Sequence, residues 1–240
     1  MAANYIAFKH IFPSPFGYAN FGESNRELNK LLINDIDLHR EKNESKERTF
    51  RGNNKAWQSE GELENQYPNF EKLRKMIDET SKPILKHSGY SDSMVSTLRV
   101  RNLWSNVIDG IGGFSFPHTH PSAMTLWTGV YYPNGMEEVN NLDEFTEQDI
   151  IKLHRQKGSG SLVLFDPSRN MKNLLSADYD DREYYGGEIT IVPRESLLLL
   201  FPVWMTHMVM PMMSDEKRYS ISFSIVKTYT EDPKYGHLQQ

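Results

Sequence analysis

The chain has 240 residues, no cysteine and a formal net charge of −5 at pH 7. A chain of this length can form one sizeable domain, and an acidic balance without a lysine and arginine run argues against generic nucleic-acid binding. Because there is no cysteine, disulfides and thiolate zinc sites are excluded, and a metal site must use histidine and carboxylate ligands.

The N-terminal residues do not have the pattern expected of an export signal. Residues 1–6 lack a basic segment followed by an apolar core, and no apolar run approaches the roughly 20 residues that span a bilayer. We therefore expect a cytoplasmic protein without membrane contact. A homodimer is compatible with this composition.

The first part of the chain predicts an extended arm and a helix. Proline, glycine and aromatic residues in 1–22 indicate an arm or edge strand. Ser24 stands three residues before Glu27, the spacing of a capping box, and apolar residues then recur on one helical face, which predicts a helix over about 24–38. The polar segment 39–54 is expected to be a loop.

A second helix and a first strand follow. The helix is predicted to begin near Asn69, and Pro83 is expected to break or kink it. After Gly89 the pattern changes to alternation, which predicts a strand with one face formed by Leu98, Val100, Asn102 and Trp104.

The remaining pattern predicts a mainly β fold. Further strands are expected at 124–132, 161–165, 188–192, 196–201 and 219–227. Short strands after two helices favour a double-sheet jelly roll with supporting N-terminal helices. We expect a single domain over 1–240, with the arm and helices in 1–90, the core in 91–230, and an insertion at 134–157 that holds a short helix at about 144–155.

The strongest chemical signal is a pair of histidines, His118 and His120, in the segment Pro117–Pro121. Two residues one position apart on a strand point the same way, so both imidazoles can reach one ion. His207, from a distant strand, can complete a face of three ligands. Fe(II) enzymes that activate dioxygen need such a face, usually two histidines and a carboxylate, and here His120 occupies the usual aspartate position.

Arg218 is the candidate anchor for a co-substrate. If that co-substrate is 2-oxoglutarate, its distal carboxylate requires a buried cation, best supplied by a guanidinium. Arg218 follows His207 by eleven residues, in the next strand, and shares a strand face with Ser220 and further serines. The alternative is a surface cation beside Glu216 and Lys217.

Several ordered motifs resemble the 2-oxoglutarate/Fe(II) oxygenase family found in marine bacteria and phages. They span most of residues 50–226 and comprise Asn54–Ser59, Trp104–Asn106, His118–Pro121, Trp127–Tyr132, Phe165–Pro167, Leu200–Pro202 with His207, and Arg218–Phe223. The resemblance implies a double-stranded β-helix with iron held by His118, His120 and His207. It also implies 2-oxoglutarate held by Arg218 with help from Ser220.

Aromatic and methionine residues near these motifs are mostly expected in the core. Tyr131 and Trp204 are the two that can face the pocket, and we assign Tyr131 to the cofactor-binding residues. Hydroxylation is the expected reaction, and the substrate, small or macromolecular, is not readable from the sequence.

The departure from the usual motif leaves an alternative ligand set open. An imidazole in place of a carboxylate leaves the iron centre one unit more positive, and no acidic residue occurs from Phe114 to Met136. A carboxylate ligand would have to come from elsewhere, and Asp166 is the nearest candidate in strand order.

Two other classes compete with an oxygenase. A cupin-type metal protein fits Gly112 and the histidine pair, but the glutamate expected a few residues later is absent and His207 comes too late. A non-catalytic jelly-roll binding or structural module would need no anchor such as Arg218. A hydrolase is disfavoured because the sequence has no Gly-x-Ser-x-Gly elbow.

Overall fold

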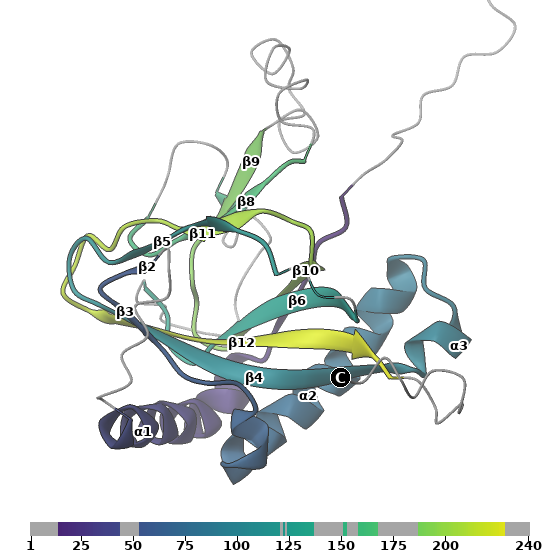
Figure 1. Cartoon of the computed structure of the whole chain (residues 1–240), viewed down its shortest axis with the longest axis horizontal. Coiled ribbons are helices and arrows are strands. Elements are labelled where there is room, and N and C mark those ends of the chain that lie inside the picture. The colour runs from purple at the N-terminus through teal and green to yellow at the C-terminus, as the bar shows by residue number, and fades with distance from the viewer. Residues whose placement is uncertain are drawn as a thin grey trace, which may run out of the picture.

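Two six-stranded sheets face each other in the computed structural model of the chain (Figure 1). The structure describes residues 14–43, 53–120, 122, 124–136, 151–152, 158–167 and 187–228. All strand pairs in both sheets are antiparallel. This arrangement, with helices packed on one side, confirms the predicted mainly β fold.

The larger sheet carries the long strands. Its order is β1 (Gly17–Asn20), β10 (Leu197–Pro202), β6 (Thr125–Tyr132), β12 (Lys217–Lys227), β4 (Leu98–Asp109) and β3 (Ala56–Gln58). The arm predicted for the start of the chain is therefore an edge strand where the structure describes it, at β1.

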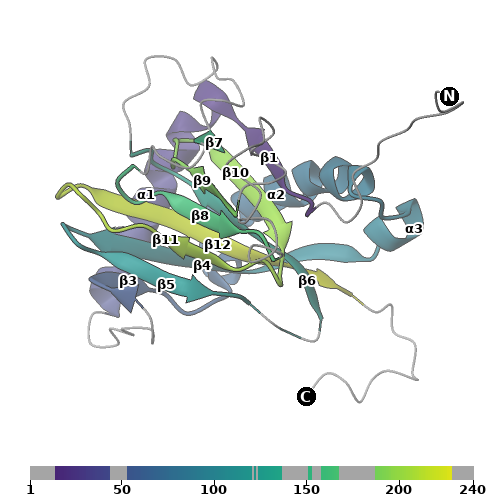
Figure 2. The ribbon, with the colours of Figure 1, turned by 90° about the horizontal axis from the view of Figure 1, so that it is seen from above.

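The smaller sheet is built from short strands. Its order is β2 (Asn53–Asn54), β5 (Phe114–His118), β11 (His207–Val209), β8 (Leu162–Phe165), β9 (Glu188–Ile191) and β7 (Ile151–Lys152). Viewed from above, β5, β11 and β8 lie over β12 and β4 (Figure 2). The inner faces of the two sheets thus enclose the space in which a site can form.

The helices cover the outer face of the larger sheet (Figure 1). They are η1 (Gly22–Asn25), α1 (Arg26–Lys42), η3 (Leu63–Asn65), α2 (Pro68–His87) and α3 (Asp92–Val95). The main apolar core lies between these helices and the sheet, and its fully buried members include Leu32, Ile36, Phe70, Leu73, Ile77, Leu103, Val107, Ile221 and Phe223. Burial on this side holds the sheet rigid beneath the site.

Both predicted helices exist, but their ends differ from the prediction. The expected capping box does not form, because Asn25 is the N-cap residue, makes no side-chain cap bond, and Ser24 donates to the carbonyl of Phe21 instead. Helix α1 then continues to Lys42, into the predicted loop. Pro83 does not break α2, which runs through to His87.

A bulge in β4 overturns the predicted face of that strand. Asn102 has a φ of 58°, and between the pairs Ser222–Trp104 and Ser224–Arg101 the strand β4 contains one residue more than β12. Side chains beyond the bulge therefore change sides. Trp104 faces the other sheet rather than sharing a face with Leu98 and Val100, which lie in the helix-side core.

Glu64 supports this bulge from below. Its buried carboxylate accepts the backbone N–H groups of Asn102 at 2.7 Å and Leu103 at 2.9 Å. Gly61 leaves room for the Asn102 side chain, since a Cβ there would lie 1.8 Å from the Asn102 Oδ1. The bulge is thus specified by side chains from outside the strand.

The predicted insertion lies mostly outside the described residues. Within it the structure describes 134–136 and 151–152, and the latter pair forms strand β7 against β9. The short helix predicted over 144–155 is therefore wrong at residues 151–152.

Candidate metal centre

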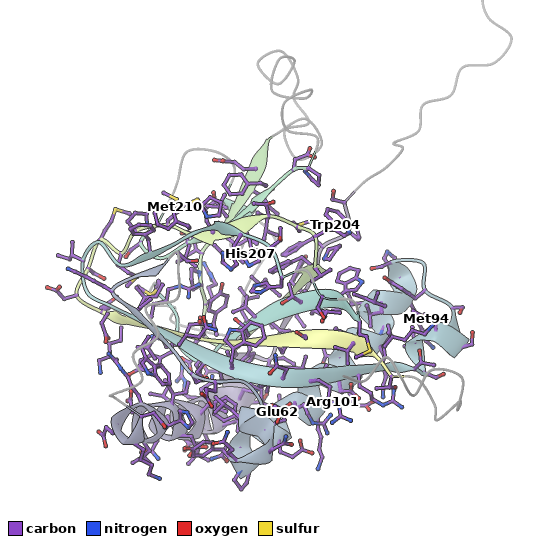
Figure 3. All side chains as sticks on the ribbon, in the orientation of Figure 1. Glu62, Met94, Arg101, Trp204, His207 and Met210 are labelled. Atoms are coloured by element: carbon purple, nitrogen blue, oxygen red, sulfur yellow. The ribbon has the colours of Figure 1, made fainter. Side chains whose placement is uncertain are left out.

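Three histidines converge between the sheets. His118 ends β5, His120 follows two residues later, and His207 begins β11 directly opposite His118 in the antiparallel pair. One nitrogen of each ring lies within 4.8 Å of the others, and the Nε2 atoms of His120 and His207 are 3.2 Å apart. Figure 3 shows His207 on the side of the smaller sheet that faces the larger one. The structure thus brings together the three predicted ligands.

Burial keeps two of these rings neutral. Desolvation, together with a smaller electrostatic effect of His118, lowers the pKa of His207 to about 3 and that of His120 to about 4. A neutral imidazole has one nitrogen lone pair free for a metal. His120 and His207 therefore offer nitrogen donors at neutral pH.

The separation of two of the rings fits ligands that share one metal ion. Two neighbouring ligands, each about 2.1 Å from an ion, lie about 3.0 Å apart in octahedral and about 3.4 Å apart in tetrahedral geometry. The 3.2 Å between the Nε2 atoms of His120 and His207 lies between these distances. Asp166 is not part of the group, which is made of three histidines in the part of the chain that the structure describes.

A cavity of about 580 Å³ connects the histidines with Arg218. Its walls come from both sheets and include Trp104, Tyr132, Ser220, Ser222 and Ser224. His207 lies in β11 and Arg218 lies in β12. These two strands were predicted to be neighbours, but they belong to different sheets. The predicted face shared by Arg218 and the serines is confirmed, because all of them line the cavity.

Arg218 is a buried cation held by neutral groups. Its side chain donates from Nε to the carbonyl of Gly160 at 2.8 Å, from Nη1 to Ser220 at 3.0 Å and from Nη2 to the hydroxyl of Tyr132 at 3.2 Å. Burial lowers its pKa and the Tyr132 hydroxyl opposes that shift. No carboxylate among the described residues forms an ion pair with Arg218. Two of its five N–H donors have no partner among the described residues and can bind an anion.

The sequence that forms this cavity also matches a known protein family. A family model described as "Putative 2OG-Fe(II) oxygenase" matches residues 102–224, which are 123 of the 240 residues. The chain belongs to this oxygenase family. Its metal is Fe(II) and its co-substrate is 2-oxoglutarate.

Solved structures share the fold of this oxygenase. A prolyl hydroxylase from Trichoplax adhaerens, in complex with a hypoxia-inducible-factor peptide, is 16% identical, with a TM-score of 0.55 over 95% of this chain and 88% of that one. AviO1 from Streptomyces viridochromogenes is 12% identical, with a TM-score of 0.54 over 90% and 91%. HygX from Streptomyces hygroscopicus, with nickel and 2-oxoglutarate bound, is 10% identical, with a TM-score of 0.53 over 90% and 84%.

These similarities concern the fold, which is the jelly roll predicted from the strand pattern. A search of curated proteins gives no match to the sequence. Among the helices of the described residues, none combines the length and the apolar composition of a membrane span.

Tyr131 does not reach the cavity of the oxygenase. It is fully buried on the helix side of the larger sheet, where its hydroxyl donates to Asn29 at 2.6 Å and accepts from Asn25. Its assignment to the cofactor pocket is therefore wrong. The neighbouring Tyr132 points the other way, as strand alternation requires, and contacts Arg218.

Two groups that hold Arg218 were missed in the sequence, the hydroxyl of Tyr132 and the carbonyl of Gly160. Tyr132 shares its strand face with Thr128 and Val130, which line the cavity, but the sequence does not show which face of this strand points inward. The carbonyl of Gly160 has no sequence signal, because any residue carries a carbonyl. Only the turn that brings it to Arg218 makes it a binding group.

Proposed function

We propose that His118, His120 and His207 hold the Fe(II) of this oxygenase, and that Arg218 binds the distal carboxylate of 2-oxoglutarate. One observation carries the proposal: the three imidazoles share a cavity with a buried arginine that has no acidic partner among the described residues. A buried guanidinium without an anion is costly, and a carboxylate ligand would offset that cost.

The pocket residues prepare the binding of both groups. Ser220 and Tyr132 hold the guanidinium from two sides, so that its remaining donors stay oriented. The depressed pKa values keep His120 and His207 unprotonated, which leaves their lone pairs available. Fe(II) and 2-oxoglutarate, when bound, couple the oxidative decarboxylation of the co-substrate by dioxygen to oxidation of a substrate.

Aromatic side chains pack against two of the three histidines. Phe201 contacts the ring of His207 edge-on at a centroid distance of 4.9 Å, and Trp104 contacts His120 at 5.6 Å. These side chains displace water from the metal ligands, which strengthens the electrostatic interactions of the site. Hydroxylation of an organic substrate in the cytoplasm is the activity that we propose.

An anaerobic titration tests this function. Addition of Fe(II) and then 2-oxoglutarate should give a weak visible charge-transfer band that is lost in His118→Ala and His207→Ala. Iron binding without the band and without 2-oxoglutarate affinity would contradict the proposal.

Arg218→Ala separates co-substrate from metal. It should weaken 2-oxoglutarate binding by roughly 100-fold or more, since it removes the partner of a buried charge, while Fe(II) affinity is retained. Ser224→Ala is a matched control on the same strand face, with no contact to Arg218. Loss of metal in Arg218→Ala would show that Arg218 has another role.

A further inference from the structure

Two of the three histidines are oriented by backbone hydrogen bonds. Nδ1 of His118 lies 2.7 Å from the carbonyl of Phe116, and Nδ1 of His207 lies 3.0 Å from the carbonyl of Met205. In both cases the carbonyl belongs to the residue two positions earlier. Because a carbonyl only accepts, each Nδ1 carries the proton and each Nε2 presents its lone pair. This is the support that metal-binding histidines usually have.

His120 lacks this support. Its Nδ1 has no hydrogen bond within the described residues, and its ring has one polar contact, from Nε2 to the Nε2 of His207. The backbone N–H of His120 donates to the carbonyl of Val203 at 3.3 Å, which is long for such a bond. Another interaction must therefore set the orientation of this ring.

Trp104 supplies a contact from the opposite sheet. Its ring meets that of His120 edge-on, with centroids 5.6 Å apart and an interplanar angle of 61°. The indole is 8% exposed and lies in register with Ser222 on the inner face of the larger sheet. It reaches this face only because of the bulge at Asn102. The bulge and its support by Glu64 thus bring an aromatic ring against the third histidine.

We infer that Trp104 is a positioning residue for the third metal ligand: it orients His120 by packing, as backbone carbonyls orient His118 and His207. The inference rests on the proposed function, since it assumes that the three histidines bind metal. It adds a residue outside the ligand set that determines how well His120 binds.

Metal affinity measures this role directly. Calorimetric titration with Co(II), without 2-oxoglutarate, should show a roughly 2- to 12-fold higher Kd for Trp104→Leu, the range expected for loss of one aromatic edge contact. Trp104→Phe keeps an aromatic edge and should recover most of the affinity. Trp204→Leu is the control, because Trp204 is 49% exposed in the turn before β11 and makes no ring contact with the described histidines.

A double-mutant cycle distinguishes positioning from a general structural role. In a His120→Ala background, Trp104→Leu should cause no further loss of Co(II) affinity, because the residue that it orients is gone. Equal losses in both backgrounds, or an unchanged Kd in the single variant, would overturn the inference. If Trp104→Leu does not fold by circular dichroism, Trp104→Met replaces it in the same cycle.

Two further outcomes keep the inference separate from the proposed function. If His118→Ala and His207→Ala still bind Co(II) as the native protein does, the proposed metal site is wrong. If they lose binding while the cycle shows no coupling, only the role of Trp104 fails.

In the native protein Co(II) should also quench part of the tryptophan fluorescence, and this part should be absent in Trp104→Phe.

Discussion

Gly160 should be as important for co-substrate binding as the side chains of the pocket. It has a φ of +63°, in the left-handed region, and its carbonyl accepts the Nε–H of Arg218 at 2.8 Å. A Cβ at this position would lie 2.9 Å from Cδ of Arg218 and 2.8 Å from Sδ of Met212. Gly160→Ala therefore strains the backbone and pushes against the guanidinium at the same time.

The magnitude follows from these two effects. An alanine in the left-handed region costs about 1–2 kcal/mol, which should appear as a loss of folding free energy. Carbon contacts are favourable at about 3.5–4.0 Å, so the Arg218 side chain must move by roughly 0.6 Å or more. Weakening a charged hydrogen bond by about 1–2 kcal/mol corresponds to a roughly 5- to 30-fold loss of 2-oxoglutarate affinity.

The same turn offers a matched control. At Gly158 an added Cβ has its nearest contact at 3.2 Å, to Oγ of Ser161, and Arg218 is not among its neighbours. Urea unfolding and anaerobic 2-oxoglutarate titration of Gly160→Ala and Gly158→Ala should separate the two positions. Native affinity in Gly160→Ala, with stability equal to that of Gly158→Ala, would refute the argument that this turn holds Arg218.

Three more predictions concern charges and hydrogen bonds around the cavity. The pKa values of His120 and His207 in the folded protein, about 4 and about 3, lie below the ordinary 6.5. Below pH 6.5 the unfolded chain therefore binds more protons than the folded chain, and the metal-free protein should lose stability as the pH falls. Between pH 7.5 and 5.5 each of the two rings should lower the free energy of unfolding by about 1.4 kcal/mol, measured by urea unfolding with chelator present. His120→Gln and His207→Gln should each remove the contribution of the ring that is replaced. An unchanged pH dependence in both variants would contradict this. Tyr132→Phe removes one hydrogen-bond partner of Arg218 and should destabilise the protein by about 1.5–3 kcal/mol while Co(II) affinity stays native. A large loss of Co(II) binding would count against the separation of the metal site from the Arg218 site. Glu64→Gln can no longer accept both backbone N–H groups of the β4 bulge and should cost about 1.5–3 kcal/mol in urea unfolding, so a native midpoint would argue against that support.

The fold was predictable where periodicity is local. The helix-face spacing in α1 and α2 and the alternation in β12 are read from a few neighbouring residues, and all three elements exist. Strand β11 has three residues, and its structure depends on pairing with β5 and β8, which are distant in the chain. Strand β7 likewise depends on β9. Such strands are defined by tertiary partners and not by their own pattern.

The candidate site was predictable in its histidines, its arginine and the serine face of β12, and not in its other walls. The histidines and the arginine stand out in the sequence because their residue types and motifs already indicate a chemical role. The structure brings His118, His120, His207 and Arg218 to one cavity. Wall residues depend on strand parity, which one bulge reverses, as at Trp104. The choice between two adjacent tyrosines was equally a choice of face, and no local property of that strand distinguishes the two faces.

The three histidines and Arg218, which has no ion-pair partner among the described residues, belong to one charge balance. With three neutral imidazoles the proposed site keeps the full double charge of Fe(II), and Arg218 adds one positive charge. Among the described residues that line the cavity the one acidic side chain is Glu60, which is exposed at the rim. A dianionic co-substrate is then the main source of negative charge. The absence of a carboxylate ligand among the described residues should therefore strengthen the binding of 2-oxoglutarate, because no described acidic side chain at this centre competes for the same cations.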